Sequence, residues 1–151
     1  MTEPAFLSAT PRHGLPLLFA GQAQKEVTIN ESLVLADFLF HCAVEGEREE
    51  PPAEPAEGEL WLVGANPIGD WSDRGRQVAG WSGGGWRYIR PQTGMRIYDR
   101  SMSVFRLYNG SWRVAVKPVE PQGGSVIDAE ARAYISNIVA ALTFCGFFAA
   151  K

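Results

Sequence analysis

The stretch Val78-Ala-Gly-Trp-Ser-Gly-Gly-Gly-Trp-Arg87 is followed, 26 residues later, by a second version of the same pattern, Val104-Phe-Arg-Leu-Tyr-Asn-Gly-Ser-Trp-Arg113. Each version is an apolar run, a glycine-containing turn and a Trp-Arg pair. Asn109-Gly110 favours a type I′ turn, because both turn positions need positive φ, and the glycines from Gly83 to Gly85 give the same freedom. The repeat therefore predicts two β-hairpins.

Further short strands surround these hairpins. Leu60-Trp-Leu-Val63 and Arg96-Ile-Tyr98 are apolar or alternating runs of strand length. Five or six short strands with turn residues between them are typical of a small antiparallel sheet or barrel. We therefore assign residues 59–121 to a Trp-rich β domain.

The region before this domain, residues 1–46, is predicted to be an N-terminal arm and a helix from about Gln22 to Ala43. The apolar residues expected on one face of this helix are Ile29, Leu33, Ala36 and Phe40, with Val34, Phe38 and Cys42 beside it. Before the helix, Leu15-Pro-Leu-Leu-Phe19 is apolar, and Pro16 favours an extended backbone. We expect this extended segment to pair with the edge of a sheet, either its own or that of a neighbouring copy.

Residues 47–58 are acidic and rich in proline, with Glu49-Glu-Pro-Pro-Ala-Glu-Pro55 at their centre. Proline interrupts helices and sheet ladders, and a dense run of acids cannot form a packed core. The composition predicts a solvated linker between the helix and the β domain.

The C-terminal region, residues 122–151, contains the clearest helical period. Ser125 or Asp128 is suited to cap this helix. The apolar residues that follow a coiled-coil spacing are Ala131, Ile135, Ile138, Leu142 and Cys145. So short a helix needs packing for stability. Its partner is either the rest of its own chain or copies of itself around a symmetry axis, and the spacing leaves both open. The predicted class is therefore α+β: an N-terminal helix, a small Trp-rich antiparallel sheet or barrel, and a C-terminal oligomerisation helix.

The composition excludes several classes of protein. The net charge of −3 and the pI of about 5.4 argue against a nucleic-acid-binding protein and against docking on an acidic membrane. No signal peptide and no run long enough to span a bilayer is visible, so we expect synthesis in the cytoplasm without membrane insertion. The two cysteines, Cys42 and Cys145, lie in apolar helical patterns and are expected to be small buried residues.

Catalytic signals are weak, and we expect a protein that is not an enzyme and uses no cofactor or metal. His13 and His41 lie in different regions, and no nucleophile, phosphate-binding or metal-ligand motif is present. A glycosidase needs two carboxylates across a cleft. Asp70, Asp73 and Asp99 are available, but their spacing singles out no pair, so glycan degradation is the third-ranked interpretation.

Tryptophan, tyrosine and arginine are concentrated in the β domain. A small sheet needs few large aromatics in its core, and the remainder would be free to stack on sugars or to anchor a protein interface. The candidates for binding a polysaccharide or a partner protein are Trp71, Trp81, Trp86, Tyr88, Trp112 and Arg87. The alternative is that these residues form the core and its cross-strand pairs.

Several stretches together resemble a known family. They are Leu15 to Glu31 with its Ala20-Gly-Gln-Ala-Gln-Lys-Glu26 segment, Pro51-Pro52 with Gly58 to Gly64, Gly75 to Trp81 with Gly85-Trp86, and the helix that begins at Asp128. They are similar to an alphaproteobacterial phage and prophage domain of unknown function. That domain is found in tail-fibre and head-spike proteins and in gene transfer agents, the phage-like particles that carry host DNA between cells.

The resemblance implies a structural protein of a phage-like particle, with no catalytic residues. Longer relatives carry extra fibre domains, so a short head-spike or tail-fibre base or adaptor involved in host attachment fits this chain best. We expect a homo-oligomer, either a trimer or a pentamer. Its partners would be capsid, fibre or baseplate proteins and the host capsule polysaccharide. The runner-up function is a monomeric carbohydrate-binding module that recognises capsule polysaccharide.

Overall fold

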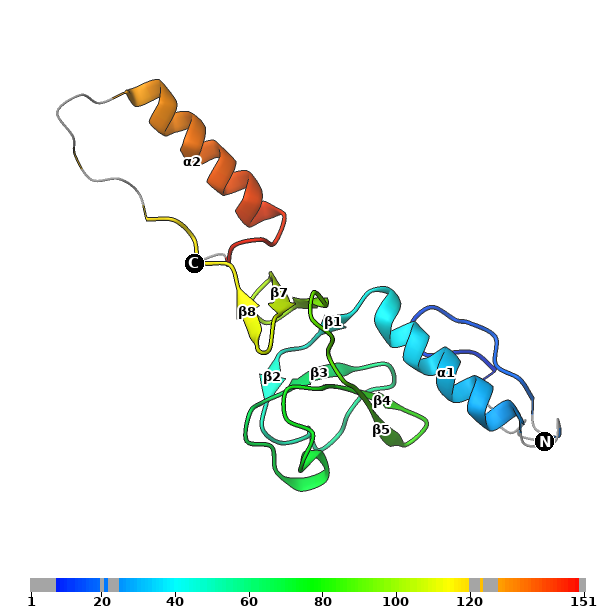
Figure 1. The fold of residues 1–151 in the computed structure, drawn as a ribbon. Coiled ribbons are helices and arrows are strands. Elements are labelled where there is room, and N and C mark those ends of the chain that lie inside the picture. Colours follow the sequence, from blue (N-terminus) through cyan, green and yellow to red (C-terminus); the bar gives the residue numbers. More distant parts are fainter. Residues whose placement is uncertain (1–7, 20, 22–24, 120–122, 124–127, 150–151) are drawn as a thin grey trace. The chain divides into compact units, whose positions relative to one another are not determined.

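The computed structural model describes residues 8–19, 21, 25–119, 123 and 128–149 (Figure 1). It confirms the α+β class: an N-terminal helix, two small sheets with a tryptophan cluster, and a C-terminal helix. The predicted single sheet is thus divided in two. The chain forms two compact units, residues 1–91 and 92–151, and each contains one copy of the sequence repeat. Among the helices that the structure describes, none has the length and apolar character needed to cross a bilayer.

The first unit contains a helix, a short 3₁₀ turn and a mixed sheet. Its elements are α1 (Lys25–Phe40), β1 (Ala43–Val44), β2 (Glu47–Arg48), β3 (Leu60–Val63), η1 (Gly69–Trp71), β4 (Val78–Ser82) and β5 (Gly85–Ile89). The sheet has the order β2-β3-β4-β5. Strand β2 runs parallel to β3, and the remaining pairs are antiparallel.

The second unit contains the antiparallel strands β6 (Arg96–Asp99), β7 (Val104–Tyr108) and β8 (Trp112–Val114), followed by α2 (Ala129–Phe144). Of the two predicted caps, Asp128 caps α2 and its side chain accepts a hydrogen bond from the Ala131 N–H at 2.8 Å, while Ser125 lies outside the described residues. After the helix, the Gly146 carbonyl accepts a hydrogen bond from the Phe105 N–H at 2.6 Å. The residues after α2 are therefore fixed to β7.

Both repeats form the predicted hairpins, but their turns differ. In the first hairpin Ser82 pairs with Gly85, so the turn has two residues, Gly83 and Gly84, both with positive φ. This is the type I′ geometry that suits the twist of the strands. In the second hairpin Tyr108 pairs with Trp112, and of the turn residues between them only Gly110 has positive φ. The type I′ prediction is therefore wrong for Asn109-Gly110, because the turn has one residue more.

The acidic segment is not the solvated linker that its composition predicted. β2 lies within it and pairs with β3. The Glu49 carboxylate accepts a hydrogen bond from the Asn66 N–H at 2.8 Å, and the Glu57 carboxylate accepts one from the Gly83 N–H at 2.9 Å. The segment is an ordered part of the first unit because its carboxylates satisfy backbone donors. The division between units falls after Pro91 instead.

The extended segment from Leu15 to Phe19 also has a different partner from the one expected. It folds back on the residues before it, with an antiparallel bridge between Ala9 and Pro16 and a 2.8 Å hydrogen bond from the Leu17 N–H to the Ser8 carbonyl. The Asn30 side chain on α1 then hydrogen-bonds both backbone groups of Leu18 at 2.9 Å. The segment is thus half of a small hairpin, and no described sheet edge pairs with it.

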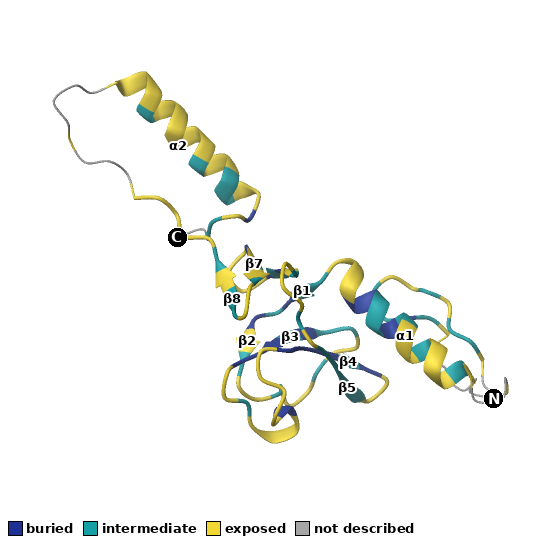
Figure 2. Ribbon diagram, viewed as in Figure 1, coloured by how far each residue is buried: buried dark blue, intermediate teal, exposed yellow. Residues whose placement is uncertain are grey.

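Helix α1 packs on the sheet through the side of the predicted apolar surface that Val34 and Phe38 occupy, not through a face centred on Ile29 and Phe40. Its buried residues are Val34, Asp37 and Phe38, Leu33 and Ala36 are half-buried, and Ile29 and Phe40 are 44% and 59% exposed. Figure 2 shows the buried part of α1 in dark blue. Phe38 is fully buried above Gly80 in β4, where a glycine leaves room for the ring. Because Gly80 has no side chain, its backbone can approach the Phe38 ring closely, and α1 therefore packs on the sheet through the side that carries Phe38.

Replacing Gly80 by alanine is expected to destabilise the first unit by about 1–3 kcal/mol through overpacking. An added Cβ would lie 2.3 Å from the Phe38 ring and 2.6 Å from a Leu60 methyl group. The matched control is Gly85→Ala in the neighbouring strand, where a Cβ meets nothing within 4 Å. Urea titration followed by circular dichroism measures both variants, and equal stabilities would contradict the proposed close approach.

Candidate functional site

Four of the five predicted oligomerisation residues lie in α2, which buries none of its residues in this chain, and the fifth, Cys145, is its C-cap. Ile135 and Ile138 are 55% and 45% exposed, Ala131 and Cys145 are exposed, and Leu142 is half-buried. Figure 2 shows α2 coloured mostly as exposed. Tyr134 and Phe144 add further exposed aromatic surface. The helix therefore presents an apolar face that the described residues of its own chain leave mostly exposed. Exposed Cys145 also shows that the prediction of two buried cysteines is wrong for this residue.

The predicted binding tryptophans mostly pack against one another in the first unit. Trp71 is fully buried in a cluster with Val63 and Ala79. Its ring meets Trp86 edge to face at 5.1 Å, and Trp86 meets Trp81 at the same distance. Trp71 therefore offers no ring to a partner, while Trp81 and Trp86 are half-buried cross-strand neighbours.

Tyr88 is anchored beside this cluster. Its hydroxyl donates a 2.7 Å hydrogen bond to the Asp70 carbonyl, and the Arg74 guanidinium lies 4.6 Å from its ring centre. Burial raises the pKa of Tyr88 above its usual value, although the Arg74 charge acts in the opposite direction. The phenol therefore remains protonated at neutral pH and acts as a hydrogen-bond donor.

Arg87 and Trp112 also have partners within the chain. The Arg87 guanidinium makes a bidentate ion pair with Glu31 on α1, at 2.9 Å and 2.7 Å. Because both side chains are partly exposed, solvent screening limits this pair to a modest contribution, about 0.2–1 kcal/mol. Trp112 belongs to the second unit, where its half-buried ring packs against Tyr108 at 5.2 Å.

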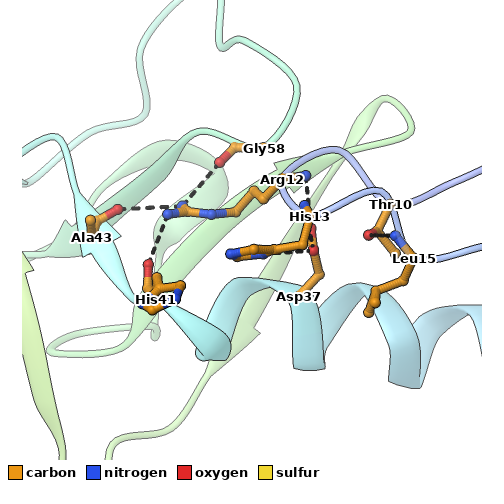
Figure 3. Close-up of polar contacts among 8 residues, drawn as sticks. All are labelled: Thr10, Arg12, His13, Leu15, Asp37, His41, Ala43 and Gly58. Carbon is orange, nitrogen blue, oxygen red and sulfur yellow. Dashed lines mark hydrogen bonds and ion pairs between the residues drawn. The ribbon is translucent and has the colours of Figure 1, made fainter.

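The most extensive polar cluster is one that sequence reasoning missed (Figure 3). Asp37 on α1 is fully buried, and its carboxylate accepts hydrogen bonds from the backbone N–H groups of Arg12 and His13 at 2.9 Å and 2.8 Å. The His13 ring also lies within 3.0 Å of the carboxylate. The Arg12 guanidinium donates in turn to carbonyls beyond the helix, including that of His41 at 2.9 Å. The cluster therefore holds the N-terminal hairpin against the end of α1.

The electrostatics of this cluster indicate a structural role. Burial opposes ionisation of Asp37, but hydrogen bonds from Arg12, Thr10 and His13 outweigh it and hold the pKa of Asp37 below its usual 3.8. Burial raises the pKa of the nearby Cys42 thiol to about 11, so the reactive thiolate is absent at neutral pH. Among the described residues, no group of three or more His, Cys, Asp and Glu side chains is placed to hold a metal ion.

A second buried carboxylate stabilises the second unit. Asp99 in β6 accepts hydrogen bonds from the Ser101 hydroxyl at 2.6 Å and from the Arg106 guanidinium at 2.8 Å. Burial opposes its ionisation, but these hydrogen bonds and the Arg106 charge lower the pKa of Asp99 below its usual value. Among the described residues, each unit thus has one fully buried carboxylate, Asp37 or Asp99, that is hydrogen-bonded within the chain.

Comparison with known proteins places the chain in a family. Residues 29–113 match the model of a family described as a protein of unknown function, DUF2793. The chain belongs to this DUF2793 family. No curated protein and no solved structure showed significant similarity to it.

The DUF2793 match begins within α1 and ends in β8. It includes Asp37, the tryptophan cluster of the first unit and both hairpins of the repeat. It leaves out Arg12 and His13, which bind Asp37, and the whole of α2. The mostly exposed helix therefore follows the matched region in the chain.

Proposed function

We propose that this DUF2793 protein is a non-catalytic, homo-oligomeric component of a phage-like particle. In this proposal it is a short head-spike or tail-fibre base or adaptor that takes part in attachment to the host cell surface. The observation that carries the proposal is the apolar face of α2, which the described residues leave mostly exposed. The particle as its location is supported by the resemblance of several sequence stretches to a phage and prophage domain.

The physical argument concerns the stability of α2. An isolated helix of 16 residues is marginal in water. Copies of α2 arranged around a symmetry axis would bury Ile135, Ile138 and Leu142 along one seam. Burying an isoleucine or leucine side chain contributes about 1.5–3 kcal/mol, and the contribution is repeated in every copy. Both a trimer and a pentamer satisfy this requirement.

The carbohydrate-binding alternative has weaker support from the geometry. Stacking on a sugar needs an exposed aromatic face. Trp71 is buried, and Trp86 has one neighbouring indole from Trp71 and another from Trp81. A monomer that binds capsule polysaccharide would nevertheless favour this alternative over assembly.

Changing Ile135 and Ile138 together to serine is expected to dissociate the oligomer, because the apolar seam would lose its central side chains. The matched control is the double change Glu130→Ser and Asn137→Ser, which alters another face of the same helix. Light scattering coupled to size-exclusion chromatography gives the mass of each variant. A wild-type chain that is monomeric at micromolar concentration, or a double-isoleucine variant of unchanged mass, would contradict assembly through α2.

The location is tested separately on purified particles. An antibody raised against this chain is expected to label the particles at a fixed position, a head vertex or the tail. Deleting the gene should then reduce adsorption of particles to host cells. Particles that contain no copy of the chain would refute the location, whatever the oligomeric state of the purified protein.

A further inference from the structure

Charged side chains are divided unequally between the two units. Residues 1–91 contain 13 acidic and 7 basic side chains, whereas residues 92–151 contain 4 acidic and 7 basic ones. The first unit is therefore acidic and the second unit basic. Such a division within one chain favours association in which the acidic part of one copy meets the basic part of another.

The basic unit has a groove on its sheet. The groove has a volume of about 460 Å³, and its apolar lining includes Phe105, Leu107 and Phe147. These three side chains are 40%, 43% and 44% exposed. Arg96 and Arg113 pair with Leu107 from the two neighbouring strands, so the register places an arginine on each side of the leucine. Adjacent strands lie about 4.8 Å apart, which separates the two arginine backbones by roughly 10 Å.

The two arginines flanking the groove have no carboxylate partner among the described residues, and Arg113 donates only a 3.4 Å hydrogen bond to the Ser111 hydroxyl. Both are exposed, and no ion pair involves either of them in the part of the chain that the structure describes. The buried carboxylate of this sheet, Asp99, is already engaged by Arg106. The groove therefore combines an apolar, aromatic floor with two available guanidinium groups.

The acidic unit presents a segment of complementary chemistry, Glu50-Pro-Pro-Ala-Glu-Pro-Ala56. Its prolines are half-buried, and the side chains of Glu50 and Glu54 are exposed. No hydrogen bond to either carboxylate occurs among the described residues. The segment is held on both sides, because Glu49 binds the Asn66 N–H and Glu57 binds the Gly83 N–H. It is thus fixed in place before any partner arrives.

We propose that the acidic proline segment, residues 50–56, of one copy binds in the arginine-flanked groove of a neighbouring copy. This inference rests on the homo-oligomer of the proposed function and adds a second contact to it. Proline rings dock on aromatic-lined grooves, while the carboxylates of Glu50 and Glu54 pair with Arg96 and Arg113. Because the segment is already ordered, little conformational entropy is lost when it binds.

The contact joins two different surfaces and is therefore heterologous. A heterologous contact repeated around an axis generates a closed ring of cyclic symmetry, such as a trimer or a pentamer. The α2 seam alone holds the copies at the axis, and the segment-groove contact links neighbours around it. The two contacts depend on different residues and can be tested apart.

The direct test is cross-linking of the full chain carrying Arg96→Lys, which keeps the charge and supplies a reactive amine. Light and ¹⁵N-labelled copies are refolded together and treated with a carbodiimide, which joins carboxylates to amines. A cross-link between Glu50 or Glu54 and position 96 is expected to contain one light and one heavy peptide. Cross-links within a single label only, or none between these positions, would overturn the proposal.

Charge reversal gives the second test. Changing Arg96 and Arg113 to glutamate is expected to weaken the oligomer at least tenfold in dissociation constant. Adding Glu50→Arg and Glu54→Arg to the same chain should restore assembly, because every ion pair is then reversed. Arg90→Glu, an exposed arginine of the first unit, is the control for altered net charge. An unchanged dissociation constant, or no recovery in the fourfold variant, would refute the contact. If the charge reversals have no effect but the Ile135/Ile138 double variant dissociates, the segment-groove contact is refuted and assembly through α2 still stands.

Discussion

Replacing Trp71 by alanine is expected to destabilise the first unit by about 3–5 kcal/mol, the range for removing a large buried aromatic side chain. Trp71 has no exposed surface and packs against Val63, Ala79 and the edge of Trp86. The cavity would lie between a 3₁₀ turn and two strands, where backbone pairing prevents the walls from collapsing. Denaturant titration followed by far-ultraviolet circular dichroism measures the loss.

Two other variants separate packing from hydrogen bonding. Among the described residues the indole N–H of Trp71 is buried and has no hydrogen-bond partner. Trp71→Phe removes this unsatisfied donor along with part of the ring, so we expect a smaller loss, about 1–2 kcal/mol. Trp112→Ala is the control for loss of an indole, because Trp112 is only half-buried and lies in the second unit. If Trp71→Ala costs less than Trp112→Ala, Trp71 is not the centre of the core.

The hairpins and both helices were predictable because their signals are local. Glycine at a turn and apolar residues on either side act over fewer than ten residues, and the repeat presents this pattern twice. The turn after Tyr108 was mispredicted because Asn-Gly suits both a two-residue and a three-residue loop. The cap at Asp128 and the spacing of the α2 apolar residues are equally local.

The remaining errors have a common physical cause, which is that the partner lies far away in the sequence. The composition of residues 47–58 indicates a linker, but Glu49 and Glu57 satisfy backbone donors 17 and 26 residues further along the chain. Likewise, nothing in the spacing distinguishes buried Trp71 from half-buried Trp81. Only the 3₁₀ turn, which directs Trp71 into the core, makes the difference.

The candidate site was therefore predictable in part. The face of α2 follows from its own period, and the structure leaves that face exposed. The groove flanked by Arg96 and Arg113 was missed, because it exists only when the register places both beside Leu107. The Asp37 cluster was missed because an acidic residue on a helix is usually exposed, and its donors lie in the preceding hairpin.

Replacing Asp37 by alanine is expected to cost about 3 kcal/mol at pH 7. The substitution removes a buried charged acceptor and leaves the backbone N–H groups of Arg12 and His13 without their partner. The N-terminal hairpin should then detach from α1, and protease sensitivity before residue 19 should increase more than global unfolding predicts. Denaturant titration and limited proteolysis measure the two effects. Glu54→Ala, which removes an exposed carboxylate, is the control in monomeric conditions.

The loss of unfolding free energy caused by Asp37→Ala depends on pH, and the lowered pKa of Asp37 determines whether it grows or shrinks toward acid. The folded pKa lies below the unfolded value of about 3.9, so above that pH the ionised carboxylate contributes its full stabilisation. As the pH falls through the folded pKa, the folded carboxylate takes up a proton and the contribution is lost. The contribution of the ionised carboxylate to the difference in unfolding free energy between wild type and Asp37→Ala should therefore shrink below about pH 4.

Asp99 also has a lowered pKa and contributes to acid sensitivity, but it is present in both proteins and cancels from the difference. A difference that stays constant down to pH 3 would show that burial, not the loss of the ionised acceptor, dominates at Asp37. A difference that increases toward acid would reverse the sign of the shift and contradict the hydrogen bonds from Arg12 and His13. Because Asp37 is one of the groups that attach the hairpin, together with Asn30 and the Arg12 guanidinium, residues 8–19 should become more protease-sensitive over the same pH range.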